Sequence, residues 1–469
     1  MQSVGDGKVY LGVWGWELGV ERIEERLARC AMFGVRPGLD SVRRALFALG
    51  DPQDSLRIVH VAGTNGKGAT CALVESALRA EGFSTGRYTS PHLVSLTERF
   101  LLDGKAVPES LLDEVYSSMP ELGALTYFEL LTAVAFELYR RRRVDWLVLE
   151  TGLGGRLDAT NVVKRPEVCV ITRIGLDHCD WLGGTLREIA AEKGGIIKPG
   201  VPVVLGAMPE EARDTIGKIA AERGSPCFYA PDEVLYGDIP EGFALGGKFN
   251  RENALTALAA LKVLGVSRKA VEQGFASVVW PGRFHLLVNG GRRFIIDGAH
   301  NPPAMRALVD SLKAEMLGGK DGFKVRSVVC GFCGDKDVDA NLSLLREVSA
   351  SGMAVAIRNP RSLGAEETAR KMRKAGFSDV RVCGTLERHS RRRRKVRSCA
   401  DPFFWRGRRC RCCRRSSLAA GILFQTRCCR GGANENCGWA FGRRRFIGCG
   451  SDDERGRIRC CRHNDAPVA

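Results

Sequence analysis

Short apolar runs rich in β-branched residues alternate with amphipathic runs along most of the chain. The apolar runs predict buried strands, and runs whose apolar residues recur every three or four positions predict helices. The expected strands are residues 58–62, 144–150, 168–172, 201–205, 294–297, 325–329 and 353–357. The expected helices are residues 20–27, 40–47, 71–80, 126–136, 188–197 and 253–261. This alternation is typical of an α/β protein with a doubly wound, mostly parallel sheet.

The turn between the first strand and its helix is rich in glycine and contains a lysine. Backbone N–H groups in such a loop, with the positive end of the following helix, form a cradle for phosphate, and a central lysine can reach the terminal phosphates of a nucleotide. The spacing differs from that of the common phosphate loop, because the hydroxyl comes late, and a plain turn is the alternative. The residues expected to contact a nucleoside triphosphate are Gly63, Thr64, Asn65, Gly66, Lys67, Gly68, Ala69 and Thr70.

Acidic and histidine side chains follow several of the expected strands. Glu150 ends a buried strand, and ligands bind at the carboxyl ends of strands in an open α/β sheet. Beside a phosphate loop, such a carboxylate suits Mg²⁺. His178 lies beyond the next strand, with Lys193 further along, and the second unit has Asp297 and His300 after its first strand. The plain alternatives are helix caps and solvated turn residues.

Charge and cysteine divide the chain into a body and a tail. The 469 residues carry a formal net charge of +17. Residues 388–469 contain 21 Arg and one Lys against six acids, and ten of the 18 Cys lie between residues 399 and 461. The body is therefore near neutral, and a nucleic-acid-binding function would rest on the tail alone. The cysteines of the body are scattered singly, as is typical of a reducing compartment. We find neither a signal sequence nor an apolar run near 18 residues, and we therefore expect a cytoplasmic protein without a membrane partner.

The tail does not fit a zinc or RNA-binding module, although its arginines suit phosphate. Adjacent cysteine pairs such as Cys412-Cys413 are poor tetrahedral chelates, and no second Cys-x-x-Cys pair follows. Apolar periodicity also stops after Glu387. We interpret residues 388–469 as an out-of-frame translation of a GC-rich gene, with disorder or a genuine appendage as the alternatives. Resequencing the locus decides between these interpretations.

Six motifs stand in order across residues 10–387. They are residues 60–68 (HVAGTNGKG), 89–93 (TSPHL), 150–161 (ETGLGGRLDATN), 175–178 (GLDH), 192–198 (EKGGIIK) and 297–302 (DGAHNP). Together they resemble the folylpolyglutamate synthase and dihydrofolate synthase branch of the Mur ligases. The resemblance implies a Mur-ligase central domain with a P-loop-type, doubly wound sheet over residues 1–285. A smaller Rossmann-like α/β glutamate-ligase domain would follow over residues 286–387, without its final helix and strand.

The resemblance implies a ligase that uses ATP to join L-glutamate to the carboxylate of dihydropteroate or a folate through an acyl phosphate. Because the reacting groups are anions, catalysis depends on cations more than on a nucleophilic side chain. By the family pattern, Lys67 and the loop amides hold the β- and γ-phosphates. Ser90 and Glu150 would hold one Mg²⁺. His178 and a carbamylated Lys193 would hold a second, since a carbamate is an oxygen anion.

Further residues are implied in the same way, and the expected catalytic set is Lys67, His178, Lys193, Asp297 and His300. Residues Asn253, Arg283 and Asp297 would contact the nucleotide. Residues Thr126, Phe128 and Asp158 would line a pterin pocket. We expect small-molecule substrates, no nucleic-acid partner and a monomeric protein.

Two departures from the family pattern affect the nucleotide site. Ala69 stands where the family usually has Ser or Thr, so that Thr70 or Ser90 would supply the hydroxyl. The segment before Asn253 lacks the usual His.

Two other functions share such a loop. A Mur-type ligase for a cell-wall precursor would use the same ATP site, and Gly68 argues against it. A non-ligase P-loop ATPase would not need His178, Lys193 or the pair Asp297 and His300.

Overall fold

The computed structural model describes residues 23–30, 38–289, 292–317, 323–357, 359, 361–383 and 421–428, all within one unit that ends at residue 429. Within this part of the chain the strands form one sheet of eight strands and one of six. The start of the expected helix 20–27, and the tail apart from residues 421–428, lie outside the described residues. None of the described helices is long and apolar enough to cross a membrane.

The first sheet has the strand order β4-β3-β2-β5-β1-β6-β7-β8. The six strands from β2 to β8 in this order run parallel, while β3 and β4 add an antiparallel hairpin at one edge. The strands are β1 (Ile58–Ala62), β2 (Thr85–Tyr88), β3 (Phe100–Leu102), β4 (Lys105–Ala106), β5 (Trp146–Glu150), β6 (Val168–Ile171), β7 (Val203–Leu205) and β8 (Cys227–Tyr229). The predicted mostly parallel, doubly wound sheet is confirmed.

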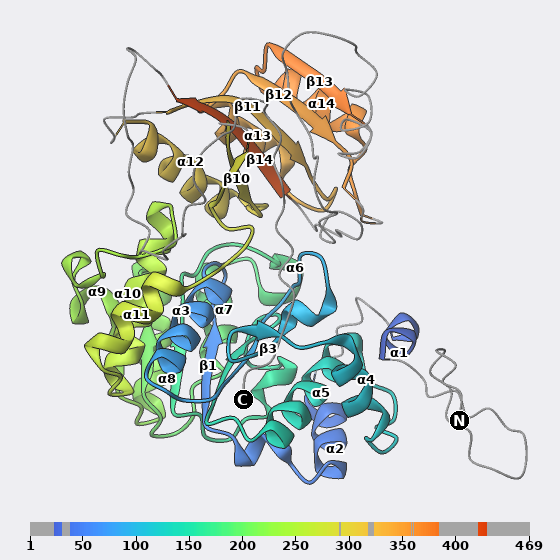
Figure 1. Ribbon diagram of the computed structural model, residues 1–469, viewed down its shortest axis with the longest axis vertical. Coiled ribbons are helices and arrows are strands. Elements are labelled where there is room, and N and C mark those ends of the chain that lie inside the picture. Colours follow the sequence, from blue (N-terminus) through green and yellow to red (C-terminus); the bar gives the residue numbers. More distant parts are fainter. Residues whose placement is uncertain are drawn as a thin grey trace, which may run out of the picture. The chain divides into compact units, whose positions relative to one another are not determined.

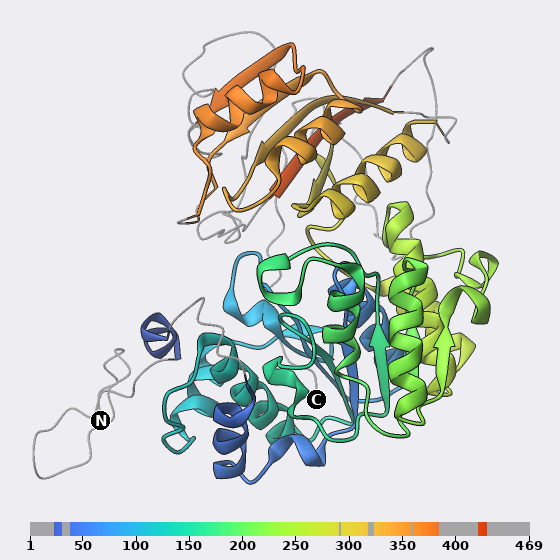
Figure 2. The same cartoon turned by 180° about the vertical axis from the view of Figure 1, so that it is seen from behind.

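Helices lie on both faces of this sheet (Figures 1 and 2). Because successive residues of a strand point to opposite faces, Ile58 packs in the core that contains α2, α4 and α5, while Val59 and Val61 pack with α3, α10 and α11. The α-helices of this part are α1 (Ile23–Arg29), α2 (Asp40–Ala48), α3 (Lys67–Ala80), α4 (Glu109–Ser117), α5 (Tyr127–Arg142), α6 (Cys179–Leu182), α7 (Leu186–Gly194), α8 (Glu210–Glu222), α9 (Ala230–Glu233), α10 (Lys248–Val263) and α11 (Arg268–Ser277). Single 3₁₀ turns are η1 (Pro52–Ser55), η2 (Leu96–Arg99), η3 (Ala159–Val162) and η4 (Tyr236–Asp238).

The second sheet has the order β13-β12-β11-β14-β10-β9 and is less parallel than the first. Strands β11, β12 and β13 are parallel, whereas β14 and β9 run antiparallel to their neighbours. Its strands are β9 (His285–Asn289), β10 (Arg292–Asp297), β11 (Phe323–Gly331), β12 (Ser351–Val355), β13 (Asp379–Cys383) and β14 (Gly421–Cys428). Its helices are α12 (Pro302–Leu317), α13 (Val338–Arg346) and α14 (Ala365–Lys374).

One segment of the Arg- and Cys-rich tail is part of this second sheet. Residues 421–428 form β14 between β10 and β11, with Ile422 opposite both Asp297 and Cys330. The expectation that no strand follows Glu387 is therefore wrong. Residues 422–424 are apolar and suit a central strand, although the sequence on either side of them is rich in Arg and Cys. The interpretation of the tail as an out-of-frame translation stays a hypothesis.

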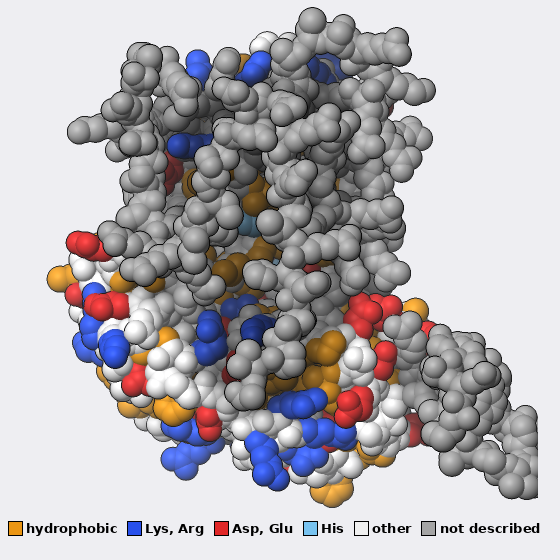
Figure 3. Space-filling model, in the orientation of Figure 1, with side chains coloured by type: hydrophobic (Ala, Val, Ile, Leu, Met, Phe, Trp, Pro, Cys, Tyr) orange, Lys and Arg blue, Asp and Glu red, His pale blue; other side chains and the backbone are white. Residues whose placement is uncertain are grey.

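Charges of both signs are interspersed over the described surface visible in Figure 3. This distribution agrees with the near-zero net charge that the sequence assigns to residues 1–387.

Candidate functional site

The loop between β1 and α3 is packed so closely that two of its glycines have no space for a side chain. Gly63 has a φ of +150°, and a Cβ there would lie 1.8 Å from the Thr172 Oγ1. Gly66 has a φ of +91°, and a Cβ would lie 2.2 Å from the Asn253 Oδ1. Glycine is required at both positions for its conformation and for its size. The predicted nucleotide residue Asn253 therefore lies directly against the loop.

The first turn of α3 presents backbone N–H groups at the end of this loop. In the described part of the chain, the amides of Lys67, Gly68 and Ala69 have no backbone acceptor, as expected for the start of a helix. A Cβ at Gly68 would lie 2.2 Å from the Trp280 Cζ2, so the indole ring closes over the turn. The Ala69 methyl is buried. Ala69, the residue that departs from the family pattern, therefore contributes a backbone amide and a buried methyl group to the loop.

Thr70 lies on the core side of α3. Its side chain is fully buried and its Oγ1 has no hydrogen-bond partner in the structure. A hydroxyl in that position faces the protein interior, so of the two alternatives that the sequence offered, Ser90 is the better placed for a ligand.

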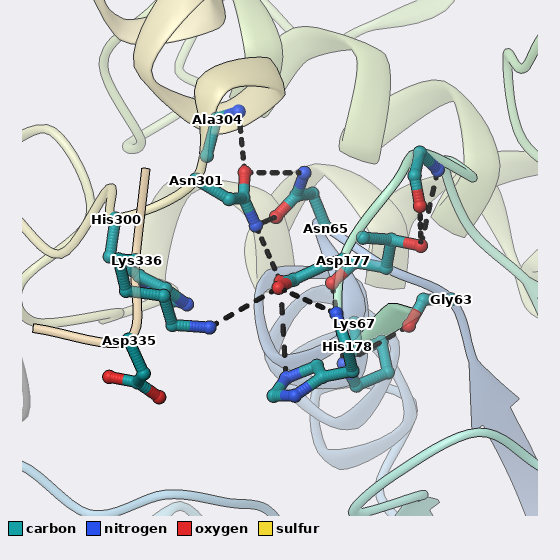
Figure 4. Close-up of polar contacts among 12 residues, drawn as sticks. Gly63, Asn65, Lys67, Asp177, His178, His300, Asn301, Ala304, Asp335 and Lys336 are labelled. Atoms are coloured by element: carbon teal, nitrogen blue, oxygen red, sulfur yellow. Dashed lines mark hydrogen bonds and ion pairs between the residues drawn. The ribbon is translucent and has the colours of Figure 1, made fainter. Parts of the chain in front are cut away.

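Two lysine side chains converge on the carbonyl oxygen of Gly63, and Figure 4 labels Lys67 and Gly63. The Lys67 Nζ donates to this oxygen at 3.1 Å, and the Lys193 Nζ donates to it at 3.0 Å. Lys193 is buried, and burial, together with the charge of Lys67, lowers the pKa of Lys193 to about 7. The ammonium group of Lys67, next to free amide N–H groups, is suited to a polyphosphate.

Glu150 lies at the end of β5, beside this positive charge. One of its oxygens is 4.0 Å from the Lys67 Nζ, and the other accepts a hydrogen bond of 3.0 Å from the Ser90 backbone N–H. Burial raises the pKa of Glu150, and the charge of Lys67 opposes this shift. A buried carboxylate whose nearest cation is at 4.0 Å can accept a further cation, which agrees with the predicted metal role.

Asp177 and His178 form the turn after β6, and Asp177 has partners from two other loops (Figure 4). The Asn301 Nδ2 donates to one carboxylate oxygen at 2.7 Å, and the Lys336 Nζ donates to the other at 3.3 Å. The Asn301 side chain also lies 3.4 Å from the Asn65 Oδ1. This network connects the phosphate loop, the turn that carries His178 and the loops after β10 and β11.

His178 adopts a left-handed backbone conformation with a φ of +54°. Its Nε2 lies 3.9 Å from the Asp177 Oδ2, and burial lowers the pKa of its imidazole. A neutral imidazole has a free lone pair, which is what a metal ion requires.

Asp297 ends β10 as a buried carboxylate that holds the following turn. Its Oδ2 accepts from the Phe284 N–H at 2.7 Å, and its Oδ1 accepts from the Ala299 N–H at 2.8 Å. Burial raises the pKa of Asp297, and the charge of Arg283 opposes the shift. His300 follows in the same turn, and its Nδ1 donates to the Gly298 carbonyl at 2.9 Å, which leaves Nε2 as an acceptor.

The three residues predicted to line a pterin pocket have mostly structural contacts. Thr126 is the N-cap of α5. The Asp158 Oδ2 accepts from the N–H groups of Gly152 and Leu153 at 2.8 Å, and its Oδ1 accepts from Thr160. A Cβ on Gly152 would lie 2.6 Å from the Phe128 Cζ, so Phe128 and Asp158 meet at Gly152. Their role in substrate binding stays a prediction.

The residues predicted to bind metal do not form a conventional cluster among the described residues. In the part of the chain that the structure describes, no three His, Cys, Asp or Glu side chains gather as a metal site. The predicted set supplies Glu150 and His178 only, so a hydroxyl and a carbamate would complete it. The buried Glu150 and the neutral His178 fit a divalent cation in chemistry, and the burial of Lys193 favours the neutral amine from which a carbamate forms.

Known proteins are similar to this chain over most of its length. The Mur ligase middle domain family matches residues 61–223, and the Mur ligase glutamate ligase domain family matches residues 282–398. The dihydrofolate synthase/folylpolyglutamate synthase of Escherichia coli (strain K12) is 38% identical over 347 residues, which are 70% of this chain and 80% of that protein.

Solved structures agree with this result. Mycobacterium tuberculosis folylpolyglutamate synthase complexed with ADP matches with a TM-score of 0.72 and 31% identity over 79% of this chain and 89% of that chain. The bifunctional folylpolyglutamate synthase/dihydrofolate synthase of Yersinia pestis, complexed with AMPPNP and Mn ion, matches with a TM-score of 0.67 and 32% identity over 79% and 91%. The chain therefore belongs to the folylpolyglutamate synthase/dihydrofolate synthase family of Mur ligases.

Proposed function

We propose that the protein is an ATP-dependent ligase that forms an amide between L-glutamate and the carboxylate of dihydropteroate, tetrahydrofolate or both. The observation that carries this proposal is the convergence of Lys67 and Lys193 on the Gly63 carbonyl, beside free helix amides and the buried Glu150. Such a site suits a polyphosphate with a divalent cation, which the AMPPNP and Mn ion complex of the Yersinia pestis relative also contains.

The reaction has two steps, and both need positive charge. The carboxylate of the pteroate or folate attacks the γ-phosphorus of ATP, which releases ADP and forms an acyl phosphate. The amine of glutamate then attacks the acyl carbon, loses a proton and displaces phosphate. Lys67 and the loop amides stabilise the negative charge on the transferring phosphoryl group, and no nucleophilic side chain is required.

Divalent cations would be held at two places. Ser90 and Glu150 would hold the first, and His178 with a carbamate on Lys193 would hold the second. A cation bound here neutralises the charge that otherwise keeps the substrate carboxylate away from the phosphates. The contact of the Lys193 Nζ with the Gly63 carbonyl supports this placement, because it puts the lysine at the phosphate loop.

The second sheet would contribute positioning groups to the same site. Asp297 and His300 lie in one turn, and Arg283, which precedes β9, lies against Gly298 of that turn. Asn301 from the same turn contacts Asp177 next to His178. Asn253 supports the loop through its contact with Gly66. Phe128 would stack against the pterin ring. We further propose that the protein acts on these small molecules as a monomer, without nucleic-acid or membrane partners.

The decisive experiment offers purified protein ATP, Mg²⁺ and labelled glutamate with either dihydropteroate or tetrahydrofolate. Label in the product of one acceptor or both is expected and identifies the substrate. If the protein binds ATP and labels neither acceptor, the proposed function is wrong.

A Lys193→Ala variant tests the carbamate in the same assay. We expect it to lose at least about 100-fold in activity. Lys164→Ala is the matched control, since Lys164 is an exposed lysine paired with Asp54. Full activity of Lys193→Ala would exclude the carbamate while leaving the ligase function intact.

A further inference from the structure

A pocket separate from the phosphate loop lies between α3, β2 and the residues that follow α11. It is partly open to solvent and is lined by Glu75, Ser76, Arg79, Arg87, Ser277 and Val279, among others. The residues from α3 lie two to three turns beyond the phosphate loop. The mechanism proposed above uses none of these side chains.

Arg87 is the unusual residue of this pocket. Its side chain is only 7% exposed, yet its guanidinium makes no hydrogen bond with any residue that the structure describes, and its Nε is a buried donor without a partner. The nearest charge is the Glu75 Oε2, at 3.6 Å from Nη1, and the guanidinium stacks 5.4 Å from the centre of the Trp280 ring. A guanidinium has five N–H donors, and leaving them unpaired in the interior is costly.

Glu75, the single carboxylate that lines the pocket, already accepts hydrogen bonds from two other side chains. The Glu75 Oε1 accepts from the Arg79 Nε at 3.2 Å and from the Thr85 Oγ1 at 2.8 Å. Two guanidinium groups therefore share one carboxylate, and the charged residues that line the pocket have a net charge of +1. Positive charge and unpaired N–H donors at the wall of a pocket are the features that bind oxyanions.

We propose that this pocket binds a small tetrahedral inorganic oxyanion of the phosphate and sulfate class, held by Arg87 and Arg79. The bound oxyanion accepts the hydrogen bonds that the Arg87 guanidinium lacks. The site is linked to the phosphate loop through Trp280, whose ring lies against Arg87 on one side and against Gly68 on the other.

The test uses the full protein saturated with ADP and Mg²⁺, so that the nucleotide occupies the phosphate loop. Crystals are soaked in selenate, and anomalous scattering locates the ion. A selenate within hydrogen-bonding distance of both guanidinium groups is expected. Water alone in the pocket, with selenate bound elsewhere, would overturn the proposal.

A matched pair of variants gives the corresponding solution measurement. Sulfate is titrated calorimetrically into the ADP-saturated protein. Arg79→Gln is expected to raise the dissociation constant at least tenfold, because Arg79 lines the pocket. Arg268→Gln removes an arginine that also pairs with a glutamate one helical turn away, but on an exposed surface, and it is expected to change nothing. Equal sulfate binding by the two variants would show that the pocket is not the site.

Discussion

Two loops of this protein have the same plan and different chemistry. Each follows a strand and precedes a helix: residues 63–66 lie between β1 and α3, and residues 298–301 lie between β10 and α12. At the first loop, the Nζ atoms of Lys67 and Lys193 donate to the Gly63 carbonyl, and the first amides of α3 have no backbone acceptor among the described residues. At the second, the carboxylate of Asp297 accepts hydrogen bonds from the Ala299 N–H of the loop and from the Phe284 N–H, which precedes β9.

The difference indicates that the first loop supplies charge to the site and that the second loop positions side chains. Under the proposed function, the first loop presents a cationic group and amides toward the nucleotide, so that its side chains would act on the ligand itself. The second loop satisfies its own backbone with a buried acid, and it thereby fixes the direction of His300 and Asn301. A substitution in the first loop should reduce activity and leave stability unchanged, while one in the second should reduce both.

The largest effect is expected for Lys67→Ala. Loss of the ammonium group that lies at the Gly63 carbonyl removes charge stabilisation of the phosphoryl group, and we expect at least about a 1000-fold loss of labelled product. The melting temperature should stay close to that of the wild type, since Lys67 is a partly exposed residue at the helix start. Lys164→Ala is again the control. A large fall in melting temperature with Lys67→Ala would contradict the view that the first loop acts on the ligand without stabilising the fold.

Asp297→Asn should affect stability as well as activity. The amide NH₂ of Asn cannot accept a hydrogen bond, so either the Phe284 or the Ala299 N–H loses its buried acceptor. We expect the free energy of unfolding to fall by about 1–3 kcal/mol, with a loss of activity as His300 is released. Chemical denaturation and the glutamate assay measure the two effects. Asp335→Asn, at a half-exposed acid paired with Arg361, is the control. Unchanged stability of Asp297→Asn would show that the second loop does not depend on this acid.

The first loop could be predicted from the sequence because its information is local. A strand, a run of glycines, a lysine and a helix stand next to one another in the chain, and Glu150 ends a strand that is plainly apolar. The observed elements match there to within a few residues. Phe128 and Asp158 are separated in the chain by most of α5 and by β5, so only the family resemblance groups them, and the structure places both at Gly152.

Other parts of the site depend on contacts between residues far apart in the chain. The partners of Asp177 lie 124 and 159 residues away, at Asn301 and Lys336, and no periodicity could pair them. A polar run directly after β11 was the only signal for Lys336. The close approach of Trp280 to Gly68 is of the same kind, and it gives a packing reason for the glycine that follows the lysine. Strand β14 was missed because its eight residues lie in a tail with the composition of a non-globular segment.

The smallest effect concerns the strand that carries the first loop and appears as a pH dependence of stability. His60 in β1 is fully buried, its Nε2 lies 2.9 Å from the Thr160 Oγ1, and burial lowers its pKa to about 3. The Thr160 hydroxyl donates to Asp158 and so accepts from the Nε2–H, which makes His60 a neutral donor. Between pH 6.5 and 3 the unfolded chain therefore binds a proton that the folded chain does not, and stability decreases as the pH falls.

This contribution has a slope of up to about 1.4 kcal/mol per pH unit. His60→Gln keeps an N–H donor toward Thr160 but cannot bind the proton. Its free energy of unfolding, measured by denaturation from pH 7 to pH 4.5, should decrease less steeply than that of the wild type, since all carboxylates are common to both proteins. Parallel curves would mean that His60 is protonated in the folded state. The neutral histidine that holds Thr160 and Asp158 would then be an incorrect description of the strand behind the phosphate loop.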